Sequence, residues 1–206
     1  MKTFWDERYQ QEDYAYGTEP NLFFKECISQ LPAGTLLLPA EGEGRNAVFA
    51  AQKGWTVTAF DQSKAGKTKA MFLAAQKGVE ITYDVWDIAH MPYPSEKFDA
   101  AALIYVHFPD HIRKEYHRNI ADKIKPGGSL ILEAFSKNNL AYRLVNPSVG
   151  GPDQLFLLFE IAEIKTDFPD FLWNIAEETE ILLDEGIFHK GKASFVRFFG
   201  KKNDLI

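Results

Sequence analysis

The fold is decided by residues 35–61, TLLLPAEGEGRNAVFAAQKGWTVTAFD, where a glycine-containing loop separates two kinds of apolar segment. The run TLLL has the length of a short buried strand, and NAVFAAQKG has helical spacing and ends at Gly54. WTVTAF then alternates as a strand and stops at Asp61. A strand, a helix and a second strand in this order predict the repeating unit of a parallel sheet.

The same alternation extends in both directions. Before the loop, NLFFKECISQL is a predicted helix, capped by Thr18, with Pro20 in its first turn. After the loop, the predicted elements are a helix at 63–78, strands at 79–85 and 98–106, a helix at 109–124 and a strand at 129–135. Five strand-then-helix units with apolar strands imply a parallel sheet covered on both faces.

The rhythm changes after Phe135. Residues 136–153 are expected to form a loop and residues 154–168 a helix. Two strands at 171–184 and 193–202 then flank EGIFHKG and predict an antiparallel hairpin. We therefore expect a doubly wound, mostly parallel seven-stranded sheet with helices on both faces, a C-terminal antiparallel hairpin and an antiparallel strand at one edge.

Composition limits the possible partners. A chain of 206 residues, 46% hydrophobic, is long enough to bury a full core in one domain. Its net charge of −6 offers no long-range attraction for nucleic acid or an anionic membrane. The single cysteine, Cys27, excludes an internal disulfide, and no apolar stretch reaches the roughly 18 residues that span a bilayer. We expect a soluble, cytoplasmic protein that acts on a small molecule.

The glycine loop first suggests a dinucleotide. Gly42 to Ala47 matches G-x-G-x-x-G/A, and Asp61 follows at the spacing of a ribose-binding acid. However, a pyrophosphate at the next helix would meet Glu43, with Glu41 just before the loop. A carboxylate 4 Å from an anion costs about 4 kcal/mol at an effective dielectric constant of about 20. An NAD(P)-dependent oxidoreductase therefore remains only as an alternative.

S-adenosylmethionine suits this loop better because it has no phosphate and carries two positive groups. Glycines permit close approach to its methionine part, and the helix N-terminus is expected to receive its carboxylate. Asp61 can accept both ribose hydroxyls, and Asp87 can accept from the adenine amino group, although each also fits a helix cap or a turn. The P-loop-like Gly66-Lys67-Thr68 lacks the first glycine of that motif, because Asp61 stands there.

The chain resembles the class I S-adenosylmethionine-dependent methyltransferases over nearly its whole length. The resemblance is carried by residues 36–63, by FDAAALIYVHFP and KIKPGGSLILEAF, and by the closing DEGIFHKGKASFVRFFGKK. Within that superfamily it is most similar to the tellurite-resistance (TehB-like) and thiopurine-methyltransferase-like group. The resemblance implies a single domain, 1–206: an N-terminal lid and helix at 1–33, cofactor-binding units at 34–135, and a substrate-side segment with the hairpin at 136–206.

The resemblance also implies a set of site residues. Those expected to contact the cofactor are Glu41, Gly42, Glu43, Gly44, Arg45, Asn46, Asp61, Gln62, Asp87, Ile88 and Tyr105. The superfamily often has an aspartate where Pro39 stands, which leaves either Glu41 or Glu43 to hold the cofactor's amino group. The D/N-P-P-Y type of motif for methylation of nucleic-acid bases is absent, and Tyr105 to Pro109 reads YVHFP there. This favours a small-molecule acceptor.

The expected reaction is transfer of a methyl group to an acceptor such as a thiol or a reduced tellurium or selenium species. His107 is the candidate general base, with a turn residue as its equally open alternative, and Tyr105 is expected near the methyl group. The residues expected to face the acceptor are Tyr16, His107, His189, Lys192 and Arg197. No grouping of ligand-type residues predicts a metal. A non-catalytic S-adenosylmethionine-binding protein is the other alternative.

Overall fold

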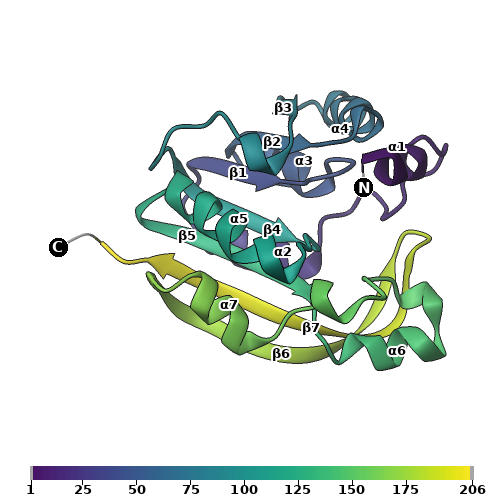
Figure 1. The fold of residues 1–206 in the computed structure, drawn as a ribbon. Helices are drawn as coiled ribbons and strands as arrows, with labels where there is room; N and C mark the ends of the chain where they lie inside the picture. The colour runs from purple at the N-terminus through teal and green to yellow at the C-terminus, as the bar shows by residue number, and fades with distance from the viewer. Residues whose placement is uncertain (1, 205–206) are drawn as a thin grey trace.

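A seven-stranded sheet forms the centre of the computed structural model, which describes residues 2–204; the ends of the predicted domain, residues 1 and 205–206, lie outside them. The strand order is β3-β2-β1-β4-β5-β7-β6 (Figure 1). The strands are β1 (Thr35–Pro39), β2 (Thr56–Asp61), β3 (Thr82–Val85), β4 (Phe98–Ile104), β5 (Ile124–Phe135), β6 (Phe171–Glu185) and β7 (His189–Lys202). The predicted doubly wound sheet with a closing hairpin is confirmed.

Strands β1 to β5 pair in parallel and are buried because helices cover both faces. One face is covered by α2 (Leu22–Ile28), α3 (Arg45–Gln52) and α4 (Lys64–Gln76), and the other by α5 (Asp110–Lys123) and α7 (Ile161–Asp167). Alternate residues of β1 serve the two cores, since Leu36 and Leu38 belong to the first and Leu37 to the second. The strands therefore hold their carboxyl ends at one common edge.

Two details of the prediction differ from the structure here. Between β3 and β4 there is only the 3-10 turn η1 (Ile88–His90), followed closely by Pro92 and Pro94, so this unit of the expected five strand-then-helix units has no α-helix. Helix α2 is capped by Asn21, whose side chain accepts from the Phe24 amide at 2.8 Å, so the prediction of Thr18 as the cap is wrong. Pro20 therefore precedes the helix and does not lie in its first turn.

The segment after β5 is also more regular than expected. Residues 136–153 contain α6 (Asn139–Val145) and the 3-10 turn η2 (Pro147–Val149), where a loop was predicted. The predicted helix at 154–168 is instead a 3-10 turn, η3 (Leu155–Leu157), followed by α7. Helix α7 begins late because Glu160 and Glu163 form a capping box at its N-terminus.

The hairpin places its turn at the carboxyl edge of the sheet. Strand β7 is antiparallel to both β5 and β6, so β6 runs in the same direction as β1 to β5. The antiparallel strand is therefore second from the edge, where an edge position was predicted. Glu185 pairs with His189, so only residues 186–188 form the turn, which is shorter than the predicted 185–191.

The N-terminal segment reaches the same edge. Helix α1 (Lys2–Tyr9) packs on α4, and the chain that follows it runs beside the hairpin tip (Figure 1). The Ile187 amide donates to the Ala15 carbonyl at 3.1 Å.

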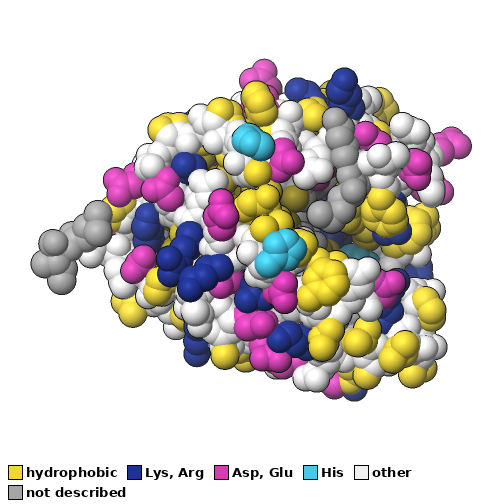
Figure 2. All heavy atoms as spheres, viewed as in Figure 1, with side chains coloured by type: hydrophobic (Ala, Val, Ile, Leu, Met, Phe, Trp, Pro, Cys, Tyr) yellow, Lys and Arg dark blue, Asp and Glu magenta, His cyan; other side chains and the backbone are white. Residues whose placement is uncertain are grey.

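Among the described residues, no helix is both long and apolar enough to cross a membrane. Figure 2 shows basic side chains interspersed with acidic ones over the face that carries α5 and α7.

Candidate cofactor and acceptor site

The loop between β1 and α3 is closely packed against its neighbours. A Cβ atom on Gly42, which has φ +63°, would lie 2.6 Å from the Tyr9 hydroxyl oxygen. A Cβ atom on Gly44 would lie 2.5 Å from the Cβ atom of Ala70, so α3 and α4 approach through this residue. Both positions therefore require glycine for contact reasons, and Tyr9 of α1 lies directly over the loop.

Glu41 caps helix α3 with its own side chain. Its Oε1 atom accepts from the backbone amides of Asn46 and Ala47, both at 2.8 Å. Burial raises the pKa of this carboxyl group from 4.5 to about 7. These amides were expected to receive the cofactor's carboxylate; that prediction is wrong for this conformation, because the helix N-terminus is already occupied by an acid.

Glu43 binds residues outside the glycine loop. Its carboxylate pairs with Lys69 of α4 at 2.8 Å and accepts from the Ala15 amide at 2.8 Å. Its side chain is 4% exposed, so this is a buried pair that fastens the N-terminal segment to the loop. In this conformation both loop carboxylates bind the chain itself, and neither faces the edge as an unpaired acid.

Asp61 lies at the end of β2, as predicted, and joins two loops. Its carboxylate accepts from the amides of Gly42 at 3.1 Å and Ser63 at 2.8 Å. Burial outweighs these bonds and raises its pKa from 3.8 to about 6. Gln62, half-buried, follows it, and the Ser63 hydroxyl donates to Asp6 of α1 at 2.6 Å. The acid is therefore next to both the glycine loop and the N-terminal helix.

Asp87 and Ile88 follow β3 at the same edge. Asp87 is exposed, and its carboxylate accepts from the Ala89 amide at 3.0 Å, as a cap for η1. The structure thus shows the capping role that the sequence left open for this residue. Ile88 is buried in the core beside Phe60. Asp87 therefore lies after β3, as predicted, but a single hydrogen bond to the backbone holds its side chain.

Tyr105 follows β4 in a left-handed conformation, with φ 59°. Its hydroxyl accepts from the Asn21 side-chain amide at 3.0 Å, and its own amide donates to the Glu133 carbonyl at 2.8 Å. The same Asn21 amide donates to the Glu133 carboxylate at 2.6 Å. A buried polar network thus holds the ring at the carboxyl edge.

His107 is enclosed and has no free nitrogen. Nδ1 donates to the Leu157 carbonyl at 2.8 Å, and Nε2 accepts from the Phe135 amide at 3.4 Å. Burial lowers its pKa from 6.5 to about 4, and its ring stacks on Phe135. Since both nitrogens are engaged with the backbone, the structure does not support the expected general base, and it shows the open alternative, a turn residue.

A second cluster surrounds the hairpin turn. Arg45 of α3 pairs with Glu185 at 2.9 Å and donates to the Tyr16 carbonyl at 2.9 Å. The His189 ring lies 4.4 Å from the Tyr16 ring and 4.8 Å from the Tyr105 ring, centre to centre. Four distant parts of the sequence therefore meet at this point: the N-terminal segment, α3, the end of β4 and the hairpin.

Lys192 and Arg197 do not join this cluster. Lys192 is exposed and pairs with Glu180 at 2.6 Å, beside the Tyr142 ring of α6. Arg197 pairs with the buried Glu133, its direct neighbour across β5 and β7, at 2.5 Å. Both cations are paired with acids of the chain, so the structure does not support the expectation that Lys192 and Arg197 face the acceptor.

The sequence missed several residues at the edge, which are Tyr9, Asn21, Glu133 and Glu185. Asn21 carried a signal, since it precedes an apolar helix as a good cap. Glu133, inside an apolar strand, carried another, since a buried acid needs a partner. Glu185 had none, because its role depends on a residue 140 positions away.

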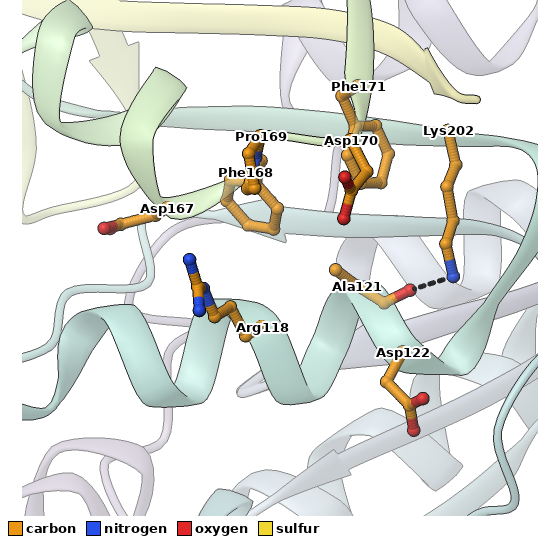
Figure 3. Close-up of a pocket in the computed structure, with 9 residues that line it drawn as sticks. All are labelled: Arg118, Ala121, Asp122, Asp167, Phe168, Pro169, Asp170, Phe171 and Lys202. Atoms are coloured by element: carbon orange, nitrogen blue, oxygen red, sulfur yellow. Dashed lines mark hydrogen bonds between the residues drawn. The ribbon is translucent and has the colours of Figure 1, made fainter.

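A cavity among the described residues lies away from the carboxyl edge. A cavity of about 330 Å³ is lined by α5, the segment before β6 and Lys202 at the end of β7 (Figure 3), which is the amino edge of the sheet. Lys202 there donates to the carbonyls of Ala121 and Ile124. Within residues 2–204, no cluster of three or more ligand-type side chains forms a metal site.

Comparison with known proteins finds a family model that matches the central region. Residues 39–128 match the family described as a methyltransferase domain. This range runs from the last residue of β1 through α5 into β5, and it includes the loop, Asp61, Asp87 and Tyr105. No curated protein matches the sequence as a relative.

Solved structures match the whole fold at low identity. One, described for the conversion of a disulfide bond into a thioacetal group during echinomycin biosynthesis, has a TM-score of 0.78 and 18% identity, covering 98% of this chain and 92% of that one. An S-adenosylmethionine-dependent methyltransferase of Methanosarcina mazei has a TM-score of 0.72 and 16% identity, covering 91% of this chain and 100% of that one. TehB from Haemophilus influenzae has a TM-score of 0.70 and 15% identity, covering 98% of this chain and 67% of that one.

At these identities the structures establish the fold. The domain match over residues 39–128 adds support for the predicted class of enzyme, a methyltransferase, and for its predicted cofactor, S-adenosylmethionine.

Proposed function

We propose that this protein transfers the methyl group of S-adenosylmethionine to a small-molecule acceptor at the carboxyl edge of its sheet. The observation that carries the proposal is the Glu41 cap on α3. A dinucleotide would place its pyrophosphate on the first amides of this helix, and two of them are held by a carboxylate at 2.8 Å. A cofactor without phosphate avoids that conflict.

The residues present fit such a cofactor. Gly42 and Gly44 leave no Cβ atom in the loop, where one would collide with Tyr9 or Ala70. We assign the cofactor to the loop glycines and to the residues after β2 and β3, namely Gly42, Gly44, Asp61, Gln62, Asp87 and Ile88. Glu41, Glu43, Arg45 and Asn46, also expected as contacts, shape the loop through bonds to the chain itself. When bound, the cofactor supplies an electrophilic methyl group on a sulfonium.

Access to the loop depends on α1. Tyr9 lies over Gly42, and Asp6 bonds to Ser63 next to Asp61. We infer that α1 moves away from the loop when the cofactor enters, and that the N-terminal segment is the lid which the sequence suggested. A closed lid keeps water from the reacting groups, which supports an in-line displacement.

The acceptor is expected beside the aromatic residues of the edge, which are Tyr16, Tyr105, Phe135, Phe188 and Phe195. Such walls exclude water and align a nucleophile at about 3 Å from the methyl carbon. A thiol, or a reduced tellurium or selenium species, is our first choice. Two points support it: the resemblance of the sequence to the TehB-like and thiopurine-methyltransferase-like group, and the structural similarity to TehB and to the protein described for the conversion of a disulfide bond into a thioacetal group.

Two experiments test the function. Calorimetric titration with S-adenosylmethionine, S-adenosylhomocysteine and NADH decides the cofactor, and binding of NADH alone would exclude the proposal. Turnover with a panel of thiols, selenite and tellurite, followed by formation of S-adenosylhomocysteine, then separates an enzyme from a protein that only binds the cofactor.

A further inference from the structure

We propose that His189 is the general base of the reaction, that Glu185 positions its ring, and that the acceptor is a thiol which still carries its proton when it binds. The inference rests on the proposed function and deepens it. It replaces His107, whose two nitrogens are engaged by backbone groups. The base would come from the hairpin, which the start of α3 contacts through Arg45.

Glu185 and His189 face each other across the tight turn. They are the last residue of β6 and the first of β7, and they pair directly in the strand register. The Nδ1 atom of His189 lies 3.5 Å from Oε2 of Glu185, and the same oxygen accepts from Arg45 at 2.9 Å. The carboxylate is therefore fixed by α3 and presents its charge to one nitrogen of the imidazole.

The ring has little freedom to turn. His189 is 4% exposed and lies between the rings of Tyr16, Tyr105 and Phe135, at 4.4, 4.8 and 5.4 Å. A Cβ atom on Gly150 would lie 2.5 Å from its Cδ2 atom and 2.9 Å from its Nε2 atom, so that ring edge packs against the backbone of Gly150, and a thiol reaches Nε2 only when this contact opens. Among the described residues no hydrogen bond uses Nε2. One nitrogen is held by an acid, and the other keeps its lone pair.

The charges around the ring favour a neutral imidazole at neutral pH. Burial lowers the pKa of His189, Arg45 of α3 and Arg8 of α1 lower it further, and Glu185 raises it. Glu185 itself remains ionised, since its pKa falls to about 2 beside His189 and Arg45. The other titratable groups near the ring are Tyr16, Tyr105 and His107. A neutral ring with Nδ1–H toward a carboxylate is the state of a general base.

The chemical step balances without another reactant. The thiol proton passes to Nε2 of His189, and the sulfur electron pair forms a bond to the methyl carbon. The bond between that carbon and the cofactor sulfonium breaks, which leaves a thioether and an imidazolium. The imidazolium then releases its proton to solvent. A thiol that is already ionised at neutral pH needs no such transfer, and this difference provides the test.

The experiment compares thiols of different acidity. Wild type and His189→Gln are assayed at pH 7 with 2-mercaptoethanol, which is almost fully protonated, and with 4-nitrothiophenol, which is ionised. We expect His189→Gln to lose about 10²- to 10³-fold in kcat/KM with the first thiol and less than about threefold with the second. Glu185→Gln should show the same pattern with smaller losses, and a shifted acid limb of the pH–rate profile. His111→Gln, an exposed histidine that also lies beside an acid, is the matched control.

Each outcome decides something. Equal losses with both thiols would show that His189 only shapes the pocket, and the base would be overturned. Absence of wild-type turnover with every thiol would overturn the acceptor class and the base together, while calorimetry would still report on the cofactor. A third readout needs no activity: two-dimensional ¹H–¹⁵N spectra of the imidazoles in the wild type. We expect the Nδ1–H tautomer for His189, and an Nε2–H tautomer would exclude the role.

Discussion

Asp61 joins the glycine loop to the strand edge through two backbone bonds. If it accepts the ribose hydroxyls, each bond to its charged form contributes about 1.5–3 kcal/mol. We expect Asp61→Ala to weaken S-adenosylhomocysteine binding by at least about tenfold in calorimetry, with the fold intact by circular dichroism. Asp153→Ala, an exposed aspartate on a loop, is the control. A change of less than about twofold for Asp61→Ala would leave it a turn residue only.

Glu41 makes a prediction about pH. The pKa of its carboxyl group is about 7 in the folded protein and 4.5 in the unfolded chain, so the folded state binds the proton more tightly. The stability that this group contributes is fully present below pH 4.5 and is lost as the pH rises through 7. We expect the free energy of unfolding in urea to fall between pH 5 and 8. The expected decrease in the free energy of unfolding is on the order of 1–2 kcal/mol after allowance for solvent screening.

The comparison is with Glu41→Gln, which keeps an oxygen acceptor for α3 but cannot ionise. This variant should lose the Glu41 share of the slope and retain the part that Asp61, with a pKa of about 6, contributes in the same direction. Identical pH slopes for the two proteins would mean that Glu41 titrates normally.

At the residue scale, sequence reasoning succeeded where a spacing rule applied. The glycines and Asp61 stand at the offsets of a nucleoside-binding loop, and the structure brings them together. It failed where a side chain had to choose among partners. The sequence placed Glu41 and Glu43 in an acidic loop, but could not show that one would cap α3 and the other pair with Lys69. His107 was misassigned for the same reason, because its partners are backbone groups 28 and 50 residues away.

Helix α1 carries the prediction at the element scale. It has only eight residues, too few for a stable isolated helix, and it is held through Asp6 and Tyr9 at the site itself. We expect hydrogen exchange of residues 2–17 to change when S-adenosylhomocysteine binds, because the ligand competes for these contacts. The strands β1 and β4 serve as the internal control. Unchanged protection of residues 2–17 would rule out a moving lid.

The elements themselves were predicted where apolar periodicity was long. The five parallel strands and α3, α4 and α5 are at the expected places, because each buries a full face. The 3-10 turn before β4, where the repeating unit would place a full helix, agrees with the nearby Pro92 and Pro94. Helix α6 could not be foreseen, since Leu144 and Val145 are exposed, and Leu140 and Tyr142 pack only partly buried against the core beside Phe135 and Phe195.

At the scale of the whole molecule, Glu133 and Arg197 link the parallel sheet to the hairpin. Loss of one partner leaves the other charge buried. We therefore expect Arg197→Leu to destabilise the protein by about 3 kcal/mol in urea unfolding, and Glu133→Leu together with Arg197→Leu to recover most of that loss. As a control, Lys190→Leu removes the exposed pair with Asp184 and should cost less than about 1 kcal/mol.

Additive losses in the double variant would contradict this prediction, since they would show that each side chain acts through packing alone. The sequence indicated the hairpin but not this pairing. The register of β5 and β7, in which two residues 64 positions apart are paired, depends on the path of the chain between the strands.

The bonds of Ile187 to Ala15 and of Glu185 to Arg45 also have a consequence for synthesis on the ribosome. The glycine loop and its neighbouring strands leave the exit tunnel well before the hairpin, which follows them in the chain. Until then the N-terminal segment has no hairpin to contact, and the edge strand β5 lacks its neighbour β7. A chain stalled before β7 should therefore expose an unpaired strand edge to chaperones.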